Sequence, residues 1–358
     1  MLLAVGTLQG KRRRDIAGLE RRDERRRRLR RRRGLLEGRS KRSETTRQRP
    51  SGEGVDHDPN CTTPASQPIL EPSKSPTRGR PDSRSKYHPT VRVRFWGVRG
   101  SVPWAIPAAI GHGCNTPCLE ITDDEAGGTL IIDAGSGVVG LGPAMAGPPR
   151  DLPILLTHYH WDHLQGLPFL SQLYTPGWRP RILAPELEAA HADWLEVLFR
   201  SPFFPVRPEH LPNKPEVEMI REGDIEVGRF AVSAIRLNHP GGAYAYRVRG
   251  LTGDLVYATD HEFGDPAIDE PLADFARGAA ALVLDAHFTP EESPAHRGWG
   301  HSNWRQCAEF AAKVDAGGLW LFHHKPGRTD EALVRIRLDA QRIFRATETA
   351  CEGEALRL

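Results

Sequence analysis

Residues 157–163 read THYHWDH and follow directly after the apolar run ILL at 154–156. Three imidazoles and one carboxylate therefore lie within six residues, at the end of a predicted buried strand: His158, His160, Asp162 and His163. Burying such a group is costly unless a cation compensates for the lost hydration. Neutral imidazole and carboxylate are ligands of zinc and, with less selectivity, of manganese or iron. The segment thus predicts a divalent-metal site rather than a solvated polar loop.

The spacing of these side chains predicts two neighbouring ions. In an extended segment alternate residues face the same side, so His158 and His160 should point together. Asp162 and His163 fall where the chain is expected to turn into the next helix, and there they can face a second ion. Two dications about 3.5 to 4 Å apart lower the pKa of a water molecule and neutralise charge on the attacked group.

Around this motif, short β-rich runs alternate with helical patterns. The runs are VRVRFWG, TLIIDAG, PILLTH, a stretch around 230–237, AYAYRV, DLVYATD, ALVLDAHF and GLWLFHH. Helical patterns cover 185–200, 303–314 and 329–344, whereas the proline-rich stretch 170–238 predicts an irregular segment that borders the site. This mixture predicts one α/β domain with sheets inside and helices outside.

The composition divides the 358 residues in two. Residues 1–90 carry 24 Lys and Arg against 11 Asp and Glu, whereas 91–358 carry 25 against 35, so the overall charge of +3 says nothing about the ligand of the second part. We expect 1–88 to be a disordered Arg-rich and Pro/Ser-rich tail, or to arise from a mis-called start, and 89–358 to be the folded domain. An arginine arm that binds nucleic acid is the functional alternative for the tail.

Other classes of protein are disfavoured. No apolar run approaches the roughly 18 to 20 residues of a membrane span, and the five scattered cysteines do not form a secreted disulfide framework. We therefore expect a cytoplasmic protein. The sequence leaves open whether the domain pairs as a homodimer.

The motif HxHxDH resembles the signature of the metallo-β-lactamase fold superfamily, and further residues match in chain order. They are Asp133 in IIDAGSG, His239 in LNHPGG, Asp260 in YATD and His323 in LFHH. The resemblance implies a four-layer αββα sandwich with two divalent ions, Zn²⁺ or alternatively Mn²⁺. It places His158, His160 and His239 on one ion, Asp162, His163 and His323 on the other, and Asp260 between them. His324 is adjacent to His323, and spacing alone does not separate the two.

Accessory residues narrow the chemistry. Asp260 stands where the best-known zinc β-lactamases carry a cysteine, which disfavours a lactamase. Residues 298–302, GWGHS, resemble the His-Ser motif of the superfamily's phosphodiesterase branch, which includes tRNA 3′-processing endonucleases and phosphoribosyl cyclic phosphodiesterases. The resemblance implies that His301 protonates the leaving oxygen, that Asp285 orients His301, and that Asp260 helps to stabilise negative charge. The alternative for His301 is a helix-entry residue beside a capping Ser302.

The sequence also bears on the substrate. The tRNA-processing enzymes carry a long arm between the third histidine and the bridging aspartate, but only 20 residues separate His239 from Asp260. A small phosphodiester is therefore preferred over tRNA as the substrate. A lactonase or thioesterase that uses the same metal pair is an alternative, as is a protein that binds nucleic acid through its tail.

The sequence leaves the roles of three smaller features open. In FWGVRGS, Gly97 and Gly100 should allow a tight turn beside the site, and Arg99 either contacts a phosphate or is exposed in a hairpin turn. Cys118 is expected to pack on a strand rather than to bind a structural zinc with Cys114. The tryptophans near the motifs either stack a base or pack in the core: Trp104, Trp161 and Trp299.

Overall fold

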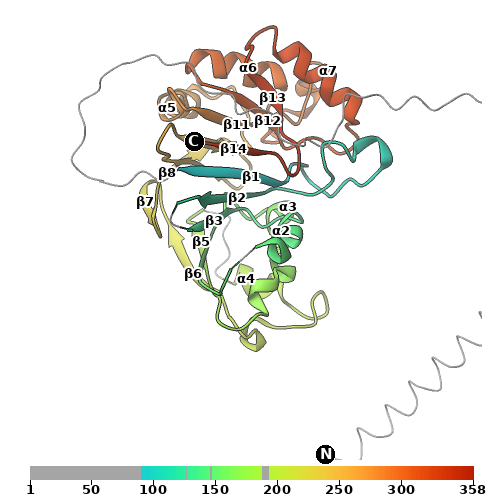
Figure 1. The fold of residues 1–358 in the computed structure, drawn as a ribbon. Coiled ribbons are helices and arrows are strands. Elements are labelled where there is room, and N and C mark those ends of the chain that lie inside the picture. The colour runs from blue at the N-terminus through green and yellow to red at the C-terminus, as the bar shows by residue number, and fades with distance from the viewer. Residues whose placement is uncertain (1–89, 126, 146, 188–192) are drawn as a thin grey trace, which may run out of the picture. The chain divides into compact units, whose positions relative to one another are not determined.

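Two seven-stranded sheets form the body of the protein (Figure 1). The computed structural model describes residues 90–125, 127–145, 147–187 and 193–358, so the predicted tail at 1–88 lies outside the described residues. Within the described part, no helix combines the length and the apolar composition that crossing a bilayer requires.

The strands of each sheet lie side by side in the following order. The first contains β14 (Ala355–Arg357), β1 (Val91–Gly97), β2 (Cys118–Asp123), β3 (Thr129–Ile132), β4 (Asp151–Leu155), β5 (Arg179–Pro185) and β6 (Glu216–Ile220). The second contains β13 (Thr347–Thr349), β12 (Leu319–Phe322), β11 (Ala281–Asp285), β10 (Leu255–Ala258), β9 (Ala243–Val248), β8 (Phe230–Leu237) and β7 (Gly223–Val227).

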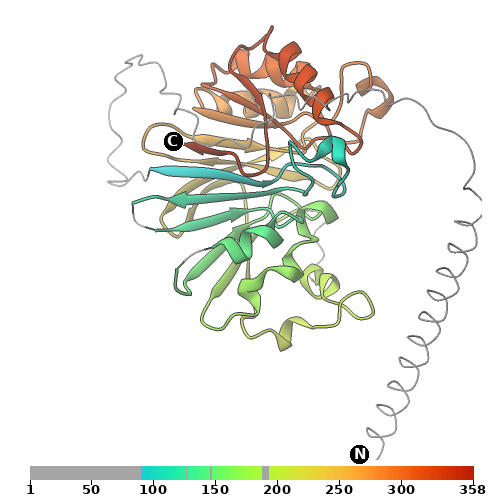
Figure 2. The same cartoon turned by 45° about the vertical axis from the view of Figure 1, so that its right-hand side comes forward.

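Helices cover the two outer faces of this pair of sheets (Figures 1 and 2). On the first sheet lie α2 (Val138–Ala144), α3 (Trp161–Leu164) and α4 (Trp194–Leu198). On the second lie α5 (Pro266–Ala276), α6 (Trp304–Lys313) and α7 (Asp330–Ala340). Short 3₁₀ turns complete the fold: Pro107–Ala109, Leu167–Phe169, Ser171–Leu173, Pro208–His210 and Ser293–His296.

Three clusters of buried apolar side chains fill the spaces between the four layers. The middle one lies between the sheets, where Phe95 of β1 and Phe322 of β12 approach with ring centroids 5.9 Å apart. A second cluster joins the helices α5, α6 and α7 to the outer face of the second sheet. A third joins α2 and α4 to the outer face of the first. The predicted αββα sandwich is therefore confirmed.

Most predicted elements are present, and the differences have local causes. All eight β-rich runs contain strands, and the helical patterns at 303–314 and 329–344 contain α6 and α7. The helical pattern at 185–200 contains α4, but its predicted start at Pro185 is wrong, because Pro185 ends β5, where it pairs with Ile220 of β6. The stretch 170–238 is also more regular than expected, since it contains the whole of β5, β6, β7 and β8.

Candidate metal centre

The residues of the predicted centre all follow the ends of strands. Residues 158–163 come after β4, and α3 begins within them at Trp161. His239 follows β8, Asp260 follows β10 and His323 follows β12. Because β10, β11 and β12 run parallel, their carboxyl ends meet at one edge of the second sheet. Ligands typically bind at this edge of α/β sheets.

Three of the histidines form a first donor cluster. Single ligand atoms of His158, His160 and His239 all lie within 4.8 Å of one another. The ring centroids of His158 and His160 are 4.6 Å apart, as expected for alternate residues of an extended segment. His239 Nε2 lies 3.0 Å from His160 Nδ1. Three imidazoles that converge in this way can hold one divalent cation.

A second cluster lies beside the first. It consists of Asp162, His163 and His323, whose ligand atoms also lie within 4.8 Å of one another. Asp162 Oδ2 is 3.2 Å from His323 Nε2 and 3.6 Å from His163 Nε2. Asp162 and His163 extend from α3, as the turn into a helix predicted.

Asp260 lies between the two clusters. Its Oδ1 is 3.9 Å from His239 Nε2 in the first cluster and 3.4 Å from His323 Nε2 in the second. Its Oδ2 is 3.3 Å from His163 Nε2 and accepts a hydrogen bond from Thr259 Oγ1 at 2.7 Å. One carboxylate thus faces both sets of donors, which is the arrangement that a bridging ligand requires.

The structure separates the two adjacent histidines. His323 has a φ of 55° and faces Asp162 and Asp260. His324 is also buried, but its Nε2 lies 2.9 Å from the carbonyl oxygen of Ala350. His323 is therefore the member of the pair that the fold brings to the centre.

Asp133 contacts the second cluster through His163, on the ring nitrogen that points away from the centre. Its Oδ2 lies 2.9 Å from His163 Nδ1 and accepts a hydrogen bond from Tyr257 at 3.1 Å. Its Oδ1 accepts a hydrogen bond from the backbone N–H of Thr157 at 2.9 Å. A carboxylate on Nδ1 fixes the ring and leaves Nε2 as the donor atom toward the centre. The early Asp-Gly turn is thus an orienting element.

Electrostatics at the centre favour a cation. Burial lowers the pKa of His158 well below its ordinary value. Burial also acts to lower the pKa of His163, but the carboxylates of Asp133, Asp260 and Asp162 raise it well above the usual range. The Nε2 atoms of His158 and His163 are buried without a hydrogen-bond partner among the described residues. Unpartnered imidazole nitrogens beside several carboxylates fit a divalent metal.

His301 and Asp285 form a pair at the rim of these clusters. His301 Nδ1 lies 2.6 Å from Asp285 Oδ2 and 3.8 Å from Asp260 Oδ1. Burial opposes protonation of His301, but Asp285 outweighs it and raises the pKa of His301 to about 9. No hydrogen bond among the described residues engages His301 Nε2. Asp285 therefore favours the protonated imidazole, which is the form that can donate a proton.

The capping alternative for Ser302 is wrong. Asn303 caps α6 through a capping box with Gln306, whereas the hydroxyl of Ser302 donates to the carbonyl oxygen of His261. Ser302 therefore connects the His301 segment to the loop that follows Asp260.

Glu262 holds the same segment from a second side. Its carboxylate accepts hydrogen bonds from the backbone N–H groups of Gly298 at 2.9 Å and of Gly300 at 2.7 Å. The carbonyl oxygen of Gly300 in turn lies 2.9 Å from His239 Nδ1. A Cβ at residue 300 would lie 2.1 Å from that nitrogen, so only glycine allows this approach. The sequence interpretation did not single out Glu262.

His287 was also missed. Its ring stacks on that of His301 with centroids 4.5 Å apart, and its Nδ1 lies 3.0 Å from the carbonyl oxygen of His323. Burial lowers the pKa of His287 well below the ordinary value. The signal that could have found it is its position two residues after Asp285, on the same side of the strand end.

The segment FWGVRGS supports the centre but does not bind phosphate through Arg99. The Arg99 side chain is fully buried, and its guanidinium donates to the carbonyl oxygens of Gly113, Arg328 and Ala109. Both predictions for Arg99, contact with a phosphate and exposure in a hairpin turn, are therefore wrong. The next residue, Gly100, packs so closely that a Cβ would lie 2.5 Å from the ring of His323.

The remaining cysteines and tryptophans have different surroundings. Cys118 is buried in the cluster under α2, as expected, and no metal-binding group among the described residues includes Cys114. Trp104 is half-buried, whereas Trp161 and Trp299 are each 60% exposed. Core packing is therefore excluded for the last two.

Comparisons with known proteins agree with this geometry. A family model described as "Beta-lactamase superfamily domain" matches residues 129–324. The chain is 26% identical over 249 residues to an uncharacterized protein of Mycobacterium leprae, covering 68% of this chain and 81% of that one. It is 25% identical over 302 residues to ribonuclease Z of Thermoplasma acidophilum, and this alignment covers 72% of this chain and 93% of that protein.

A solved structure shows the same fold. A diphosphatase from the PhnP family aligns with a TM-score of 0.55 and 19% sequence identity, over 75% of this chain and 97% of that one. The family model covers more than half of the chain and includes both donor clusters. The chain belongs to the β-lactamase superfamily, and it is a metal-dependent hydrolase that resembles the phosphodiesterase branch of that superfamily.

Proposed function

We propose that the protein hydrolyses a small phosphodiester at a centre of two divalent cations, with Zn²⁺ as the resident ion. The first cluster would hold one cation, the second would hold the other, and Asp260 would bridge them. The two cations would together supply an activated water molecule and would neutralise charge on the phosphoryl group. The ligands in this proposal are His158, His160 and His239, then Asp162, His163 and His323.

The single observation that carries the phosphodiester proposal is the pair of His301 and Asp285. A leaving alkoxide oxygen needs a proton, and a protonated imidazole beside the metal donors can provide it. The 2.6 Å contact with Asp285 holds the ring through Nδ1 and keeps it protonated. His301 would therefore donate from Nε2 to the leaving oxygen.

The short connection before Asp260 supports a small substrate. β9 and β10 pair antiparallel from Val248 and Leu255 onward, and together they occupy the interval between His239 and Asp260. The long arm expected of the tRNA-processing enzymes therefore has no place in this interval. A cyclic phosphodiester or a dinucleotide-sized ester is the substrate class that we propose.

The variant His301→Ala tests this role. We expect it to retain both metals but to hydrolyse bis-p-nitrophenyl phosphate about 10² to 10⁴ times more slowly, because only proton donation is lost. Metal content is measured by elemental analysis and turnover by release of nitrophenol. A variant that loses metal would show that the ligand assignment is wrong, and an unchanged rate would remove His301 from the reaction.

One alternative keeps the centre but changes the bond. An apolar cavity lies beside His158 and His160, and it would also accept the apolar part of a lactone or thioester. Parallel assays with cyclic nucleotides, lactones and thioesters separate these activities. Turnover of lactones without any turnover of phosphodiesters would replace the proposed function.

A further inference from the structure

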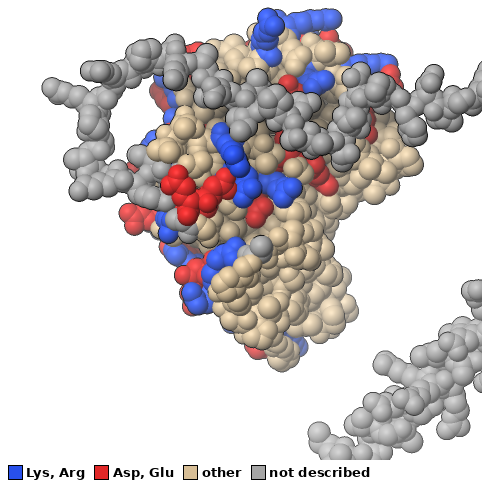
Figure 3. All heavy atoms as spheres, in the orientation of Figure 1, with Lys and Arg blue, Asp and Glu red and all other residues tan. Residues whose placement is uncertain are grey.

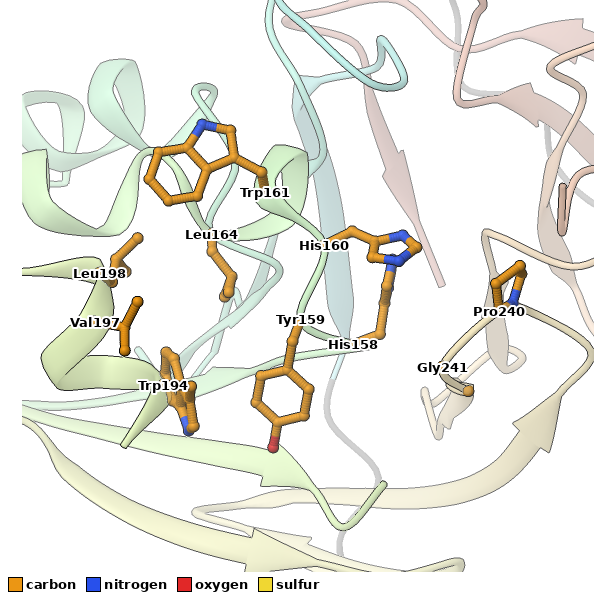
Figure 4. A pocket seen from close by; sticks show the side chains of 11 residues that line it. His158, Tyr159, His160, Trp161, Leu164, Trp194, Val197, Leu198, Pro240 and Gly241 are labelled. Carbon is orange, nitrogen blue, oxygen red and sulfur yellow. The ribbon is translucent and has the colours of Figure 1, made fainter. Parts of the chain in front are cut away.

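A cavity of about 270 Å³ opens beside the first donor cluster (Figure 4). Two of its lining residues, His158 and His160, belong to that cluster. The others are Tyr159, Trp161, Leu164, Trp194, Val197, Leu198, Pro240, Gly241 and Gly242. A group held in this cavity would therefore lie next to a group held at the metal centre.

The lining away from the two histidines is apolar and partly aromatic. None of the described lining residues is Asp, Glu, Lys or Arg. The Tyr159 hydroxyl donates to the carbonyl oxygen of Pro185 at 2.7 Å, so it already has a partner. The Trp194 ring packs on that of Tyr159 with centroids 5.5 Å apart. The cavity thus suits an uncharged group and disfavours an ionised one.

The rim of the cavity exposes large apolar side chains. Trp161 is 60% exposed and Val197 is 46% exposed, and Figure 4 shows them on the same side of the cavity as Leu198. On the face shown in Figure 3, the surface around α2 and α4 carries few charged side chains. An exposed apolar rim next to reactive groups is typical of a ligand-binding site.

We propose that this cavity binds a planar, uncharged aromatic ring of the substrate, joined to the ester that is hydrolysed at the metal centre. Indole and phenol rings offer flat faces on which another ring stacks, independently of its exact hydrogen-bonding groups. Nucleobases and aryl esters share this chemistry. The inference rests on the proposed function only for the kind of ester, because the cavity itself recognises the ring.

Pairs of ligands that differ only in the ring test the proposal. Binding to the metal-loaded full chain is measured by titration calorimetry. The pairs are phenyl phosphate with methyl phosphate, thymidine 5′-monophosphate with 2-deoxyribose 5-phosphate, and phenylacetate with acetate. We expect the ring to increase affinity by about tenfold or more. A gain in the nucleotide pair identifies a nucleobase, and a gain in the phenyl pairs alone identifies an aryl group.

The variant Val197→Asp places a charge at the rim. We expect it to reduce the gain from the ring to less than about threefold while the ring-free ligands bind as before, because an aspartate disfavours an apolar neighbour. Val334→Asp is the matched control, since Val334 is 39% exposed on α7 and does not line the cavity. Trp161→Ala provides a second variant with an exposed side chain, should Val197→Asp fail to fold.

The outcomes separate this inference from the proposed function. Equal affinities within every pair, or no binding of any ring-bearing ligand, would overturn the cavity assignment. The cavity assignment would also be overturned if both Val197→Asp and Trp161→Ala kept the full increase in affinity that the ring provides. If carboxylates bind and phosphates do not, the phosphodiester proposal fails, while the gain within the phenylacetate pair still decides the role of the cavity.

Discussion

The buried imidazoles at the centre differ in pKa because their neighbours differ. Burial keeps His158 neutral, since no carboxylate compensates fully for its lost hydration. Burial also acts on His163 and His301, but each contacts a carboxylate through Nδ1, which raises its pKa. The chemical role of each histidine thus depends on a partner that lies elsewhere in the chain.

The pH dependence of turnover follows from the pair of His301 and Asp285. Proton donation needs protonated His301, so kcat should fall as the pH rises through the pKa of about 9. The bound dications oppose protonation and move this fall toward lower pH. In Asp285→Asn the carboxylate that raises the pKa is lost, so we expect the alkaline fall at still lower pH than in the unaltered protein.

Profiles of kcat against pH for both proteins check this expectation. Asp274→Asn is a suitable control, because Asp274 lies on α5 with its side chain 78% exposed. An alkaline limb that stays at the same pH in Asp285→Asn would show that another group controls protonation of the leaving oxygen.

At the scale of elements, loops after strand ends hold the site together. The loop after β10 carries both Asp260 and Glu262, and Glu262 binds the backbone N–H groups of Gly298 and Gly300. One short loop therefore places the bridging carboxylate and also fixes the segment that presents His301. Each hydrogen bond to a charged acceptor contributes about 1.5 to 3 kcal/mol.

Replacement of Glu262 tests this coupling. In Glu262→Ala two backbone N–H groups lose their acceptor, so the 298–301 segment should shift and kcat should fall by about 10-fold to 100-fold, as small misplacements of reacting groups do. We expect metal content to be retained and the lost rate to be partly restored in Glu262→Gln. Glu291→Ala is the control, because Glu291 is exposed in the same part of the chain. Unchanged kcat in Glu262→Ala would mean that Ser302 alone positions the segment.

At the scale of the whole molecule, the two sheets bring distant segments to one edge. Asp162 from the first sheet and His323 from the second lie 161 positions apart in the chain, yet their donor atoms are 3.2 Å apart. The apolar cluster between the sheets fixes this approach. Both donor clusters lie within residues 158–323, so the predicted domain at 89–358 contains the complete centre.

Deleting residues 1–88 tests this division of the chain. We expect the shortened protein to bind two metals and to hydrolyse bis-p-nitrophenyl phosphate at the rate of the full chain, since none of the proposed ligands is removed. Nucleic-acid binding is measured in parallel at several salt concentrations. A salt-dependent affinity that disappears with the tail would support the arginine-arm alternative. A metal-loaded but inactive short form would assign the tail a part in catalysis.

Local patterns in the sequence predicted many of the strands and helices and part of the metal centre. The β-rich runs identified strands because side-chain alternation and turn residues are local signals. The same alternation placed His158 and His160 on one side, and the helical pattern at 303–314 located α6, although its cap is Asn303 rather than Ser302. The start of α4 was not predicted, because tertiary pairing of β5 with β6 outweighed the proline signal at Pro185.

By itself the sequence predicted eight of the strands and the types of donor at the centre, and the family resemblance supplied the chain order of the later donors. Only the tertiary structure decided between His323 and His324. It also showed that Arg99 is buried among carbonyl oxygens, and it revealed the roles of His287 and Glu262 and the apolar cavity. The physical reason is that a strand-end side chain faces a direction set by the register of neighbouring strands and by backbone angles such as the φ of 55° at His323. Those depend on contacts between segments that no local pattern records.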